Sequence, residues 1–182
     1  KEEYPLKPIP IAENLDIIAS SLDLIKAEVE LSHKFKREEI LNRLLEPIKA
    51  SYDYILMDCP PSLGVLTINA FVASDHIYVP IESEFLALKG YTVLSEAISW
   101  VGLEIDKVFI TKYDQRKVLN RNVVESVGEA LGDKMFKSII RQNVTLAEAP
   151  AEGLDVFRYN DKSNGAKDYT ALTAEILSTL EN

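Results

Sequence analysis

The sequence predicts an α/β domain, built as a doubly wound, mostly parallel sheet with helices on both faces. Two features of the chain favour this class. Short apolar runs of strand length alternate with longer segments of helical periodicity, which is the order of consecutive βαβ units. The apolar runs are continuous rather than alternating, as expected for strands that are covered on both faces. The 182 residues suffice for one such domain with a hydrophobic core.

The first part of the chain contributes strands and helices in turn. Residues 14–20 form a short apolar run typical of a buried strand, and residues 36–50 place their apolar side chains on one face of a helix. Pro47 is expected to kink or end that helix, because its ring removes a backbone donor. Residues 52–58 then predict another strand, and residues 64–73 predict a helix.

The remainder of the chain continues this alternation. Strands are expected at residues 75–82, 107–111 and 135–140. Helices are expected at residues 86–102 and 117–131, and the second should end near Gly132, because glycine readily closes a helix. A last helix carries an apolar stripe made of Tyr169, Leu172, Thr173, Ile176, Leu177 and Leu180.

Composition and charge narrow the classes of function. The single cysteine, Cys59, excludes an intrachain disulfide and favours a reducing, cytoplasmic location. Together with two separated histidines it does not make a zinc site. No apolar stretch reaches the length of a membrane span. The net charge of −9 disfavours a uniformly basic nucleic-acid binder, although residues 112–141 hold seven basic and four acidic side chains, a local charge of +3.

A lone acid followed by two prolines ends the apolar run at residues 52–58. Asp58 would lie at the carboxyl end of a strand, where open α/β sheets bind ligands. A carboxylate there can hold Mg²⁺, which is the Walker B role in phosphate-handling folds. Pro60 and Pro61 restrict the loop, and Ser62 is placed to cap the next helix. On these residues alone, a purely structural turn is an equally good interpretation.

Longer stretches of the sequence, from residue 52 onward, resemble a known family. Residues 52–98, YDYILMDCPPSLGVLTINAFVASDHIYVPIESEFLALKGYTVLSEAI, resemble the ParA/Soj partition ATPases of the deviant-Walker P-loop group. The stretch SIIRQNVTLAEAP is similar to the family's IIPRNVRLSEAPS, and YNDKSNGAKDYTAL to its YDPKSRGAEVYLDL. The segment IDKVFITKYDQRKVLNRNVVESV lies between residues 52–98 and SIIRQNVTLAEAP, in the same order as in the family.

This resemblance implies a partition ATPase for plasmid or chromosomal DNA. The family forms a homodimer that sandwiches ATP and Mg²⁺, binds DNA without sequence preference, and is stimulated by a ParB-type centromere-binding protein. It implies a cytoplasmic, nucleoid-associated protein that does not bind membrane.

The resemblance also implies roles for individual residues. Asp58 would be the magnesium acid, and Pro60, Pro61 and Ser62 would belong to the switch that senses the γ-phosphate. The nucleotide-side positions would be Thr111, Gln142, Asn143 and Glu148. The DNA-binding positions would be Lys112, Arg116, Lys117, Arg121, Lys137 and Arg141. The family's Pro-Arg before Asn-Val is Arg141-Gln142 here, so stacking of the base on a proline is not expected.

One departure from the family is large. The motif G-x-x-x-x-G-K-S/T, whose backbone and lysine cradle phosphate, is absent, and none of the seven glycines precedes a lysine. Residues 1–182 therefore resemble a single incomplete domain, the C-terminal portion of a ParA-like ATPase that lacks the N-terminal unit. We expect this chain alone neither to bind nor to hydrolyse ATP appreciably.

Two alternatives from other classes stay open. One is a truncated, non-enzymatic ParA-like chain that only binds a partner or another copy. The other is a MinD-like membrane-cycling ATPase, which would need a basic amphipathic C-terminal helix. The last helix is instead mildly acidic.

Overall fold

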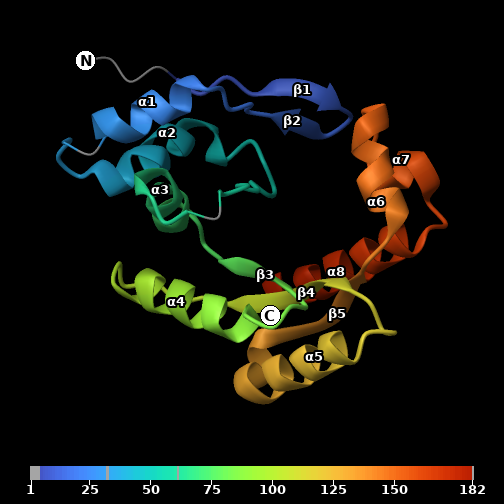
Figure 1. Cartoon of the computed structure of the whole chain (residues 1–182). Coiled ribbons are helices and arrows are strands. Elements are labelled where there is room, and N and C mark those ends of the chain that lie inside the picture. The colour runs from blue at the N-terminus through green and yellow to red at the C-terminus, as the bar shows by residue number, and fades with distance from the viewer. Residues whose placement is uncertain (1–4, 32, 61, 182) are drawn as a thin grey trace. The chain divides into compact units, whose positions relative to one another are not determined.

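The computed structural model describes residues 5–31, 33–60 and 62–181, and these form two compact units. The first unit consists of Lys1–Asp75 and Ala97–Leu103, and the second of His76–Glu96 and Glu104–Asn182. Figure 1 shows the elements in chain order. Each unit is described separately below.

The first unit holds a hairpin and a small group of helices. Its elements are β1 (Ile9–Ala12), β2 (Leu15–Ile17), α1 (Asp23–Leu31), η1 (Arg37–Glu39), α2 (Ile40–Lys49) and α3 (Val65–Ala73). Strands β1 and β2 pair antiparallel around Asn14, whose φ of 57° is left-handed. The predicted strand at 14–20 is thus shorter than expected and exposed rather than buried.

The buried side chain of Asn69 joins α3 to the start of α2. Its Oδ1 accepts from the Leu41 N–H at 3.0 Å, and its Nδ2 donates to the carbonyls of Arg37 and Val65 at 2.7 and 2.8 Å. The first N–H groups of a helix have no partner within the helix, and no side chain of its own caps α2. A neighbouring helix therefore supplies the missing acceptor.

The strand predicted at residues 52–58 is wrong, because this segment joins no strand in the described chain. Tyr54 and Leu56 are exposed. An apolar run becomes a strand only where another strand supplies hydrogen-bond partners, and none pairs with this one among the described residues. The predicted cap is also wrong: α3 begins after Gly64 without a side-chain cap, and the Ser62 carbonyl instead accepts from the Thr67 hydroxyl at 2.7 Å.

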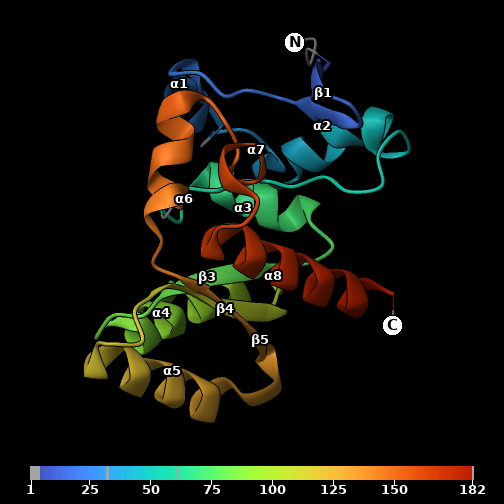
Figure 2. The same cartoon turned by 90° about the vertical axis from the view of Figure 1, so that its right-hand side faces the viewer.

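The second unit contains the parallel sheet. Its elements are β3 (Tyr78–Glu82), α4 (Ala87–Ser99, whose last residues belong to the first unit), β4 (Lys107–Tyr113), α5 (Val118–Leu131), η2 (Gly132–Lys134), β5 (Met135–Arg141), α6 (Val144–Glu148), η3 (Ala149–Glu152), α7 (Val156–Asn160) and α8 (Asn164–Leu180). The strand order is β3-β4-β5 and both pairings are parallel. Figures 1 and 2 show α8 on one face of this sheet and α5 on the other.

The α/β class predicted from the sequence is confirmed. The core of the second unit places Phe136 and Ile140 of β5 against Leu172 of α8. Of the predicted stripe on α8, Leu172 is buried, whereas Tyr169 and Thr173 are exposed. The buried face of α8 begins earlier and includes a carboxylate, Asp168.

The carboxyl ends of β3 and β4 are tied together by one buried side chain. Asn120 of α5 is 5 % exposed; its Nδ2 donates to the Ser83 carbonyl and its Oδ1 accepts from the Asp114 N–H at 2.9 Å. Just before this point the register of the β4–β5 pairing shifts, and Lys112 adopts a left-handed φ of 52°. Asn120 therefore holds the strand ends where the regular ladder stops.

We predict that Asn120→Ala destabilises the protein by about 1–3 kcal/mol, because two buried backbone groups lose their partners. Asn122→Ala, at an exposed position of the same helix, is the matched control for helix propensity and should have little effect. Urea unfolding followed by circular dichroism measures both. Equal free energies of unfolding for the two variants would contradict the role of Asn120.

Candidate functional site

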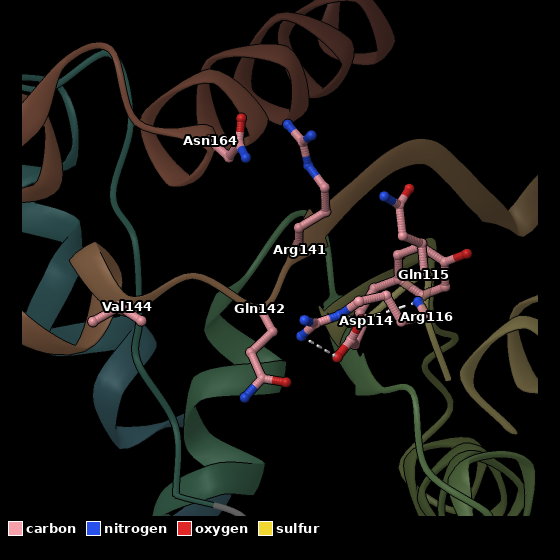
Figure 3. Close-up of a pocket in the computed structure, with 8 residues that line it drawn as sticks. Asp114, Gln115, Arg116, Arg141, Gln142, Val144 and Asn164 are labelled. Atoms are coloured by element: carbon pink, nitrogen blue, oxygen red, sulfur yellow. Dashed lines mark hydrogen bonds and ion pairs between the residues drawn. The ribbon is translucent and has the colours of Figure 1, made fainter. Parts of the chain in front are cut away.

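An open pocket of about 320 Å³ lies where β4 and β5 end. Its lining residues come from the end of β4 and the loop after it, from the end of β5 and the start of α6, and from the first residue of α8. They are Tyr113, Asp114, Gln115, Arg116, Arg141, Gln142, Val144 and Asn164 (Figure 3). The carboxyl ends of parallel strands are where open α/β sheets bind ligands.

One wall of the pocket is an ion pair between Asp114 and Arg116, both in the β4–α5 loop. The Asp114 carboxylate accepts from the Arg116 N–H at 3.0 Å and from its Nε and Nη2 at 2.9 Å each. Hydrogen bonds from Arg116, with a smaller contribution from the charge of Lys117, lower the pKa of Asp114 to about 2. Both side chains of this ion pair are therefore charged at neutral pH, and the Arg116 guanidinium remains largely exposed.

The opposite wall is fixed by a carboxylate of α8. Asp168, whose side chain is 9 % exposed, accepts from the Arg141 N–H at 3.0 Å, from Nε at 2.9 Å and from Nη2 at 2.5 Å. The hydrogen bond to Asp168 raises the pKa of Arg141. Farther along, Glu175 accepts from the N–H groups of Lys137 and Ser138 at 2.7 and 2.8 Å. Two carboxylates of one helix therefore anchor the length of β5.

Only one of the four predicted nucleotide-side residues lines this pocket, namely Gln142. Asn143 instead caps α6 by accepting from the Thr145 N–H at 2.8 Å. Glu148 accepts from the Tyr159 hydroxyl at 3.2 Å, and Thr111 lies on β4 with its hydroxyl 3.5 Å from the Ile81 carbonyl.

The Gln142 N–H donates to the Tyr113 carbonyl at 2.8 Å, extending the β4–β5 pairing by one bond. Within the described residues the Gln142 carboxamide has no hydrogen-bond partner. It is therefore available to a ligand.

Most of the predicted DNA-binding cations already have partners in the second unit. Lys112 pairs with Glu82, Arg116 with Asp114, and Arg141 with Asp168. Arg121 donates to the Gln115 carbonyl at 2.7 Å. Lys117 and Lys137 have no ion pair in the described part of the chain. The six cations thus do not form one free basic patch.

The predicted magnesium and switch residues lie in the first unit. Asp58, Pro60 and Ser62 are exposed, and Pro61 lies outside the described residues. The described chain holds no group of three or more His, Cys, Asp or Glu side chains that would bind a metal ion. A single oxygen donor such as Asp58 fits one position in the coordination of Mg²⁺ and leaves the others to water and phosphate. Burial and the neighbouring Asp58 charge raise the pKa of Cys59, which is a protonated thiol at neutral pH.

Several residues of the pocket were not predicted from the sequence. Tyr113, Asp114 and Asn164 line it, and Asn120 and Asp168 hold its walls. Asp114 and Asn164 lie within the segments that resemble the family, so the motif itself was the available signal. No spacing rule points to Asn120 or Asp168, because their partners are distant in sequence. Among the described residues, no helix is both long and apolar enough to span a membrane.

Comparison with known proteins agrees with this fold. The profile of the family described as "AAA domain" matches residues 2–128. The chain is 40% identical over 179 residues to the chromosome-partitioning ATPase Soj of Treponema pallidum, covering 95% of this chain and 70% of that protein. It is 42% identical over 170 residues to the sporulation initiation inhibitor protein Soj of Bacillus subtilis, covering 90% and 67%.

A solved structure gives the same assignment of fold. Cobyrinic acid a,c-diamide synthase from Mycobacterium smegmatis, with bound ADP and magnesium, superposes with a TM-score of 0.79 at 26% identity. The match covers 96% of this chain and 66% of that one. The chain thus spans about two thirds of the length of these relatives. On the family profile and on the two Soj relatives, the chain belongs to the ParA/Soj family of partition ATPases.

Proposed function

We propose that the intact protein containing this chain is an ATPase that partitions plasmid or chromosomal DNA. It forms a dimer with ATP, binds DNA without sequence preference, and is stimulated by a ParB-type partner in the cytoplasm, at the nucleoid. The observation that carries the proposal is the 40% identity, over 95% of this chain, to a chromosome-partitioning ATPase. The pocket at the ends of β4 and β5 supports it by its position.

In this proposal the pocket takes the nucleotide base. Tyr113 offers an aromatic surface, and Gln142 offers a donor and an acceptor to a base edge. Thr111, Asn143 and Glu148 then act behind the pocket by fixing backbone positions and neighbouring helices.

Asp58 would hold Mg²⁺, which supplies charge neutralisation at the phosphates. Its exposed carboxylate is free to do so, because no hydrogen bond engages it in the described residues. The switch that responds to the presence of the terminal phosphate would consist of Pro60, Pro61 and Ser62, and its two prolines restrict the backbone.

DNA binding is proposed for the cations around the β4–α5 loop. Lys112, Arg116, Lys117 and Arg121 lie at the end of β4 or near the start of α5, and Lys137 and Arg141 lie on β5. Arg141 contributes least among these cations, because Asp168 already engages its guanidinium. The Lys112–Glu82 pair is exposed at both side chains and contributes little free energy, so a phosphate can replace the carboxylate that now faces Lys112. The resulting contact is sensitive to salt, because it depends on release of counterions.

The central test is ATP hydrolysis by the intact protein. Asp58→Asn should lower the turnover stimulated by the ParB-type partner about a hundredfold or more, because the magnesium acid is lost. Asp53→Asn, at an exposed position of the same segment, is the matched control and should stay within about twofold of the parent. Unchanged turnover in Asp58→Asn would remove Asp58 from the site.

The 182-residue chain should bind Mg-ATP only weakly by itself, because its sequence holds no phosphate-cradling motif. Titration calorimetry on this chain, beside the intact protein, makes the comparison. Micromolar binding by the chain would contradict this expectation.

The DNA assignment is tested by charge reversal in the intact protein with ATP bound. Arg116→Glu combined with Arg121→Glu should weaken binding to random-sequence duplex and reduce the salt slope of log K by about two. Lys162→Glu combined with Lys167→Glu makes the same change of charge at exposed positions of the second unit. If both pairs weaken binding equally, net charge rather than this site governs the affinity.

A further inference from the structure

The last residue of β5 and the residue after it face opposite ways at the pocket. Figure 3 shows the Arg141 side chain running toward the helix that carries Asn164, while the Gln142 side chain runs away from it. Both residues line the pocket. The orientation of this pair therefore decides whether a guanidinium or a carboxamide is offered to a ligand.

Asp168 fixes that orientation. It accepts the Arg141 backbone N–H as well as two guanidinium donors, so it holds both the strand end and the side chain. It lies four residues after Asn164, on the same face of α8, and Asn164 itself lines the pocket. The Gln142 N–H is held from the other side by the Tyr113 carbonyl.

Stability alone does not account for this pair. The Asp168 side chain is 9 % exposed but the Arg141 side chain is 41 % exposed, and ion pairs that reach solvent contribute little free energy. What the ion pair adds is that Asp168 occupies the Nε and Nη2 donors of Arg141, so these donors are withdrawn from a ligand although Arg141 lines the pocket.

The chemistry of the two side chains differs in a way that matters for a purine. A carboxamide presents a donor beside an acceptor, which matches N7 and the amino group of adenine. A guanidinium presents two donors, which match N7 and O6 of guanine or hypoxanthine. A pocket with Gln142 free and Arg141 withdrawn therefore suits adenine.

We propose that Asp168 is a positioning residue that sets base selectivity: it occupies the guanidinium donors of Arg141, so that Gln142 rather than Arg141 contacts the base, which is adenine. The inference rests on the proposed nucleotide site and names its specificity. Loss of the Asp168 charge frees the guanidinium, and the pocket then accepts a 6-oxopurine.

The test compares affinities of the intact protein for Mg-ATP, Mg-GTP and Mg-tripolyphosphate by calorimetry. Asp168→Asn should lower the ratio of ATP to GTP affinity about tenfold and leave tripolyphosphate binding unchanged. Adding Arg141→Leu to Asp168→Asn should abolish the gain in GTP binding. Glu175→Gln, which loosens β5 from the same helix away from the pocket, should leave the ratio unchanged.

Gln142→Leu tests the same inference without disturbing the ion pair. It should weaken ATP binding about tenfold and leave tripolyphosphate binding as it was. The inference is overturned if Asp168→Asn and Glu175→Gln weaken all three ligands alike, or if Gln142→Leu and, where it folds, Asp168→Asn leave the ATP to GTP ratio intact. Failure of the parent protein to bind ATP would instead overturn the proposed function itself, and this inference with it.

Discussion

The pocket depends on how the backbone groups at the ends of the parallel strands are satisfied. A ladder of hydrogen bonds stops where its strands separate, and each buried N–H or C=O left there costs free energy unless another group pairs with it. Asn120 from one face and Asp168 from the other supply these partners at β4 and β5. Residues that follow the ends of β4 and β5 line the open pocket beyond these strand ends.

A buried asparagine that pairs with backbone groups also joins two helices of the first unit. Asn69 of α3 serves the uncapped start of α2 as Asn120 serves the strand ends. In both places a buried amide is satisfied on its donor and its acceptor side, which is the condition for a polar group to be tolerated in a core. The choice of asparagine fits, since its carboxamide can bridge a carbonyl and an N–H at once.

Much of the second unit could be predicted from the sequence, and the reason is local. Strands β3, β4 and β5 are continuous apolar runs, and α4, α5 and α8 are long enough to show helical periodicity. Helices α6 and α7 have five residues each, too few for a period to appear. Residues 52–58 show the opposite failure, because an apolar run does not reveal whether a partner strand is present.

In the candidate site, too, residues in local motifs could be predicted, whereas residues that act through distant contacts could not. Gln142 was predicted on the nucleotide side because it lies in a recognisable motif, and Arg141 was predicted only as a DNA-binding position. Asp168 acquires its role through a contact with Arg141, 27 positions earlier.

The ion pairs also separate cations that can contact DNA phosphate from a cation that forms part of the pocket wall. The sequence alone could not distinguish these two roles. The Arg116 guanidinium is 86 % exposed and uses only Nε and Nη2 for Asp114, so its remaining N–H donors can reach a phosphate while the pair stays intact. The Asp168 carboxylate is buried, and breaking such a pair leaves an uncompensated charge in the core. Of the six cations, Arg141 is therefore the one least able to turn toward DNA. Its charge is better understood as part of the wall of the pocket, committed by Asp168 before any ligand arrives.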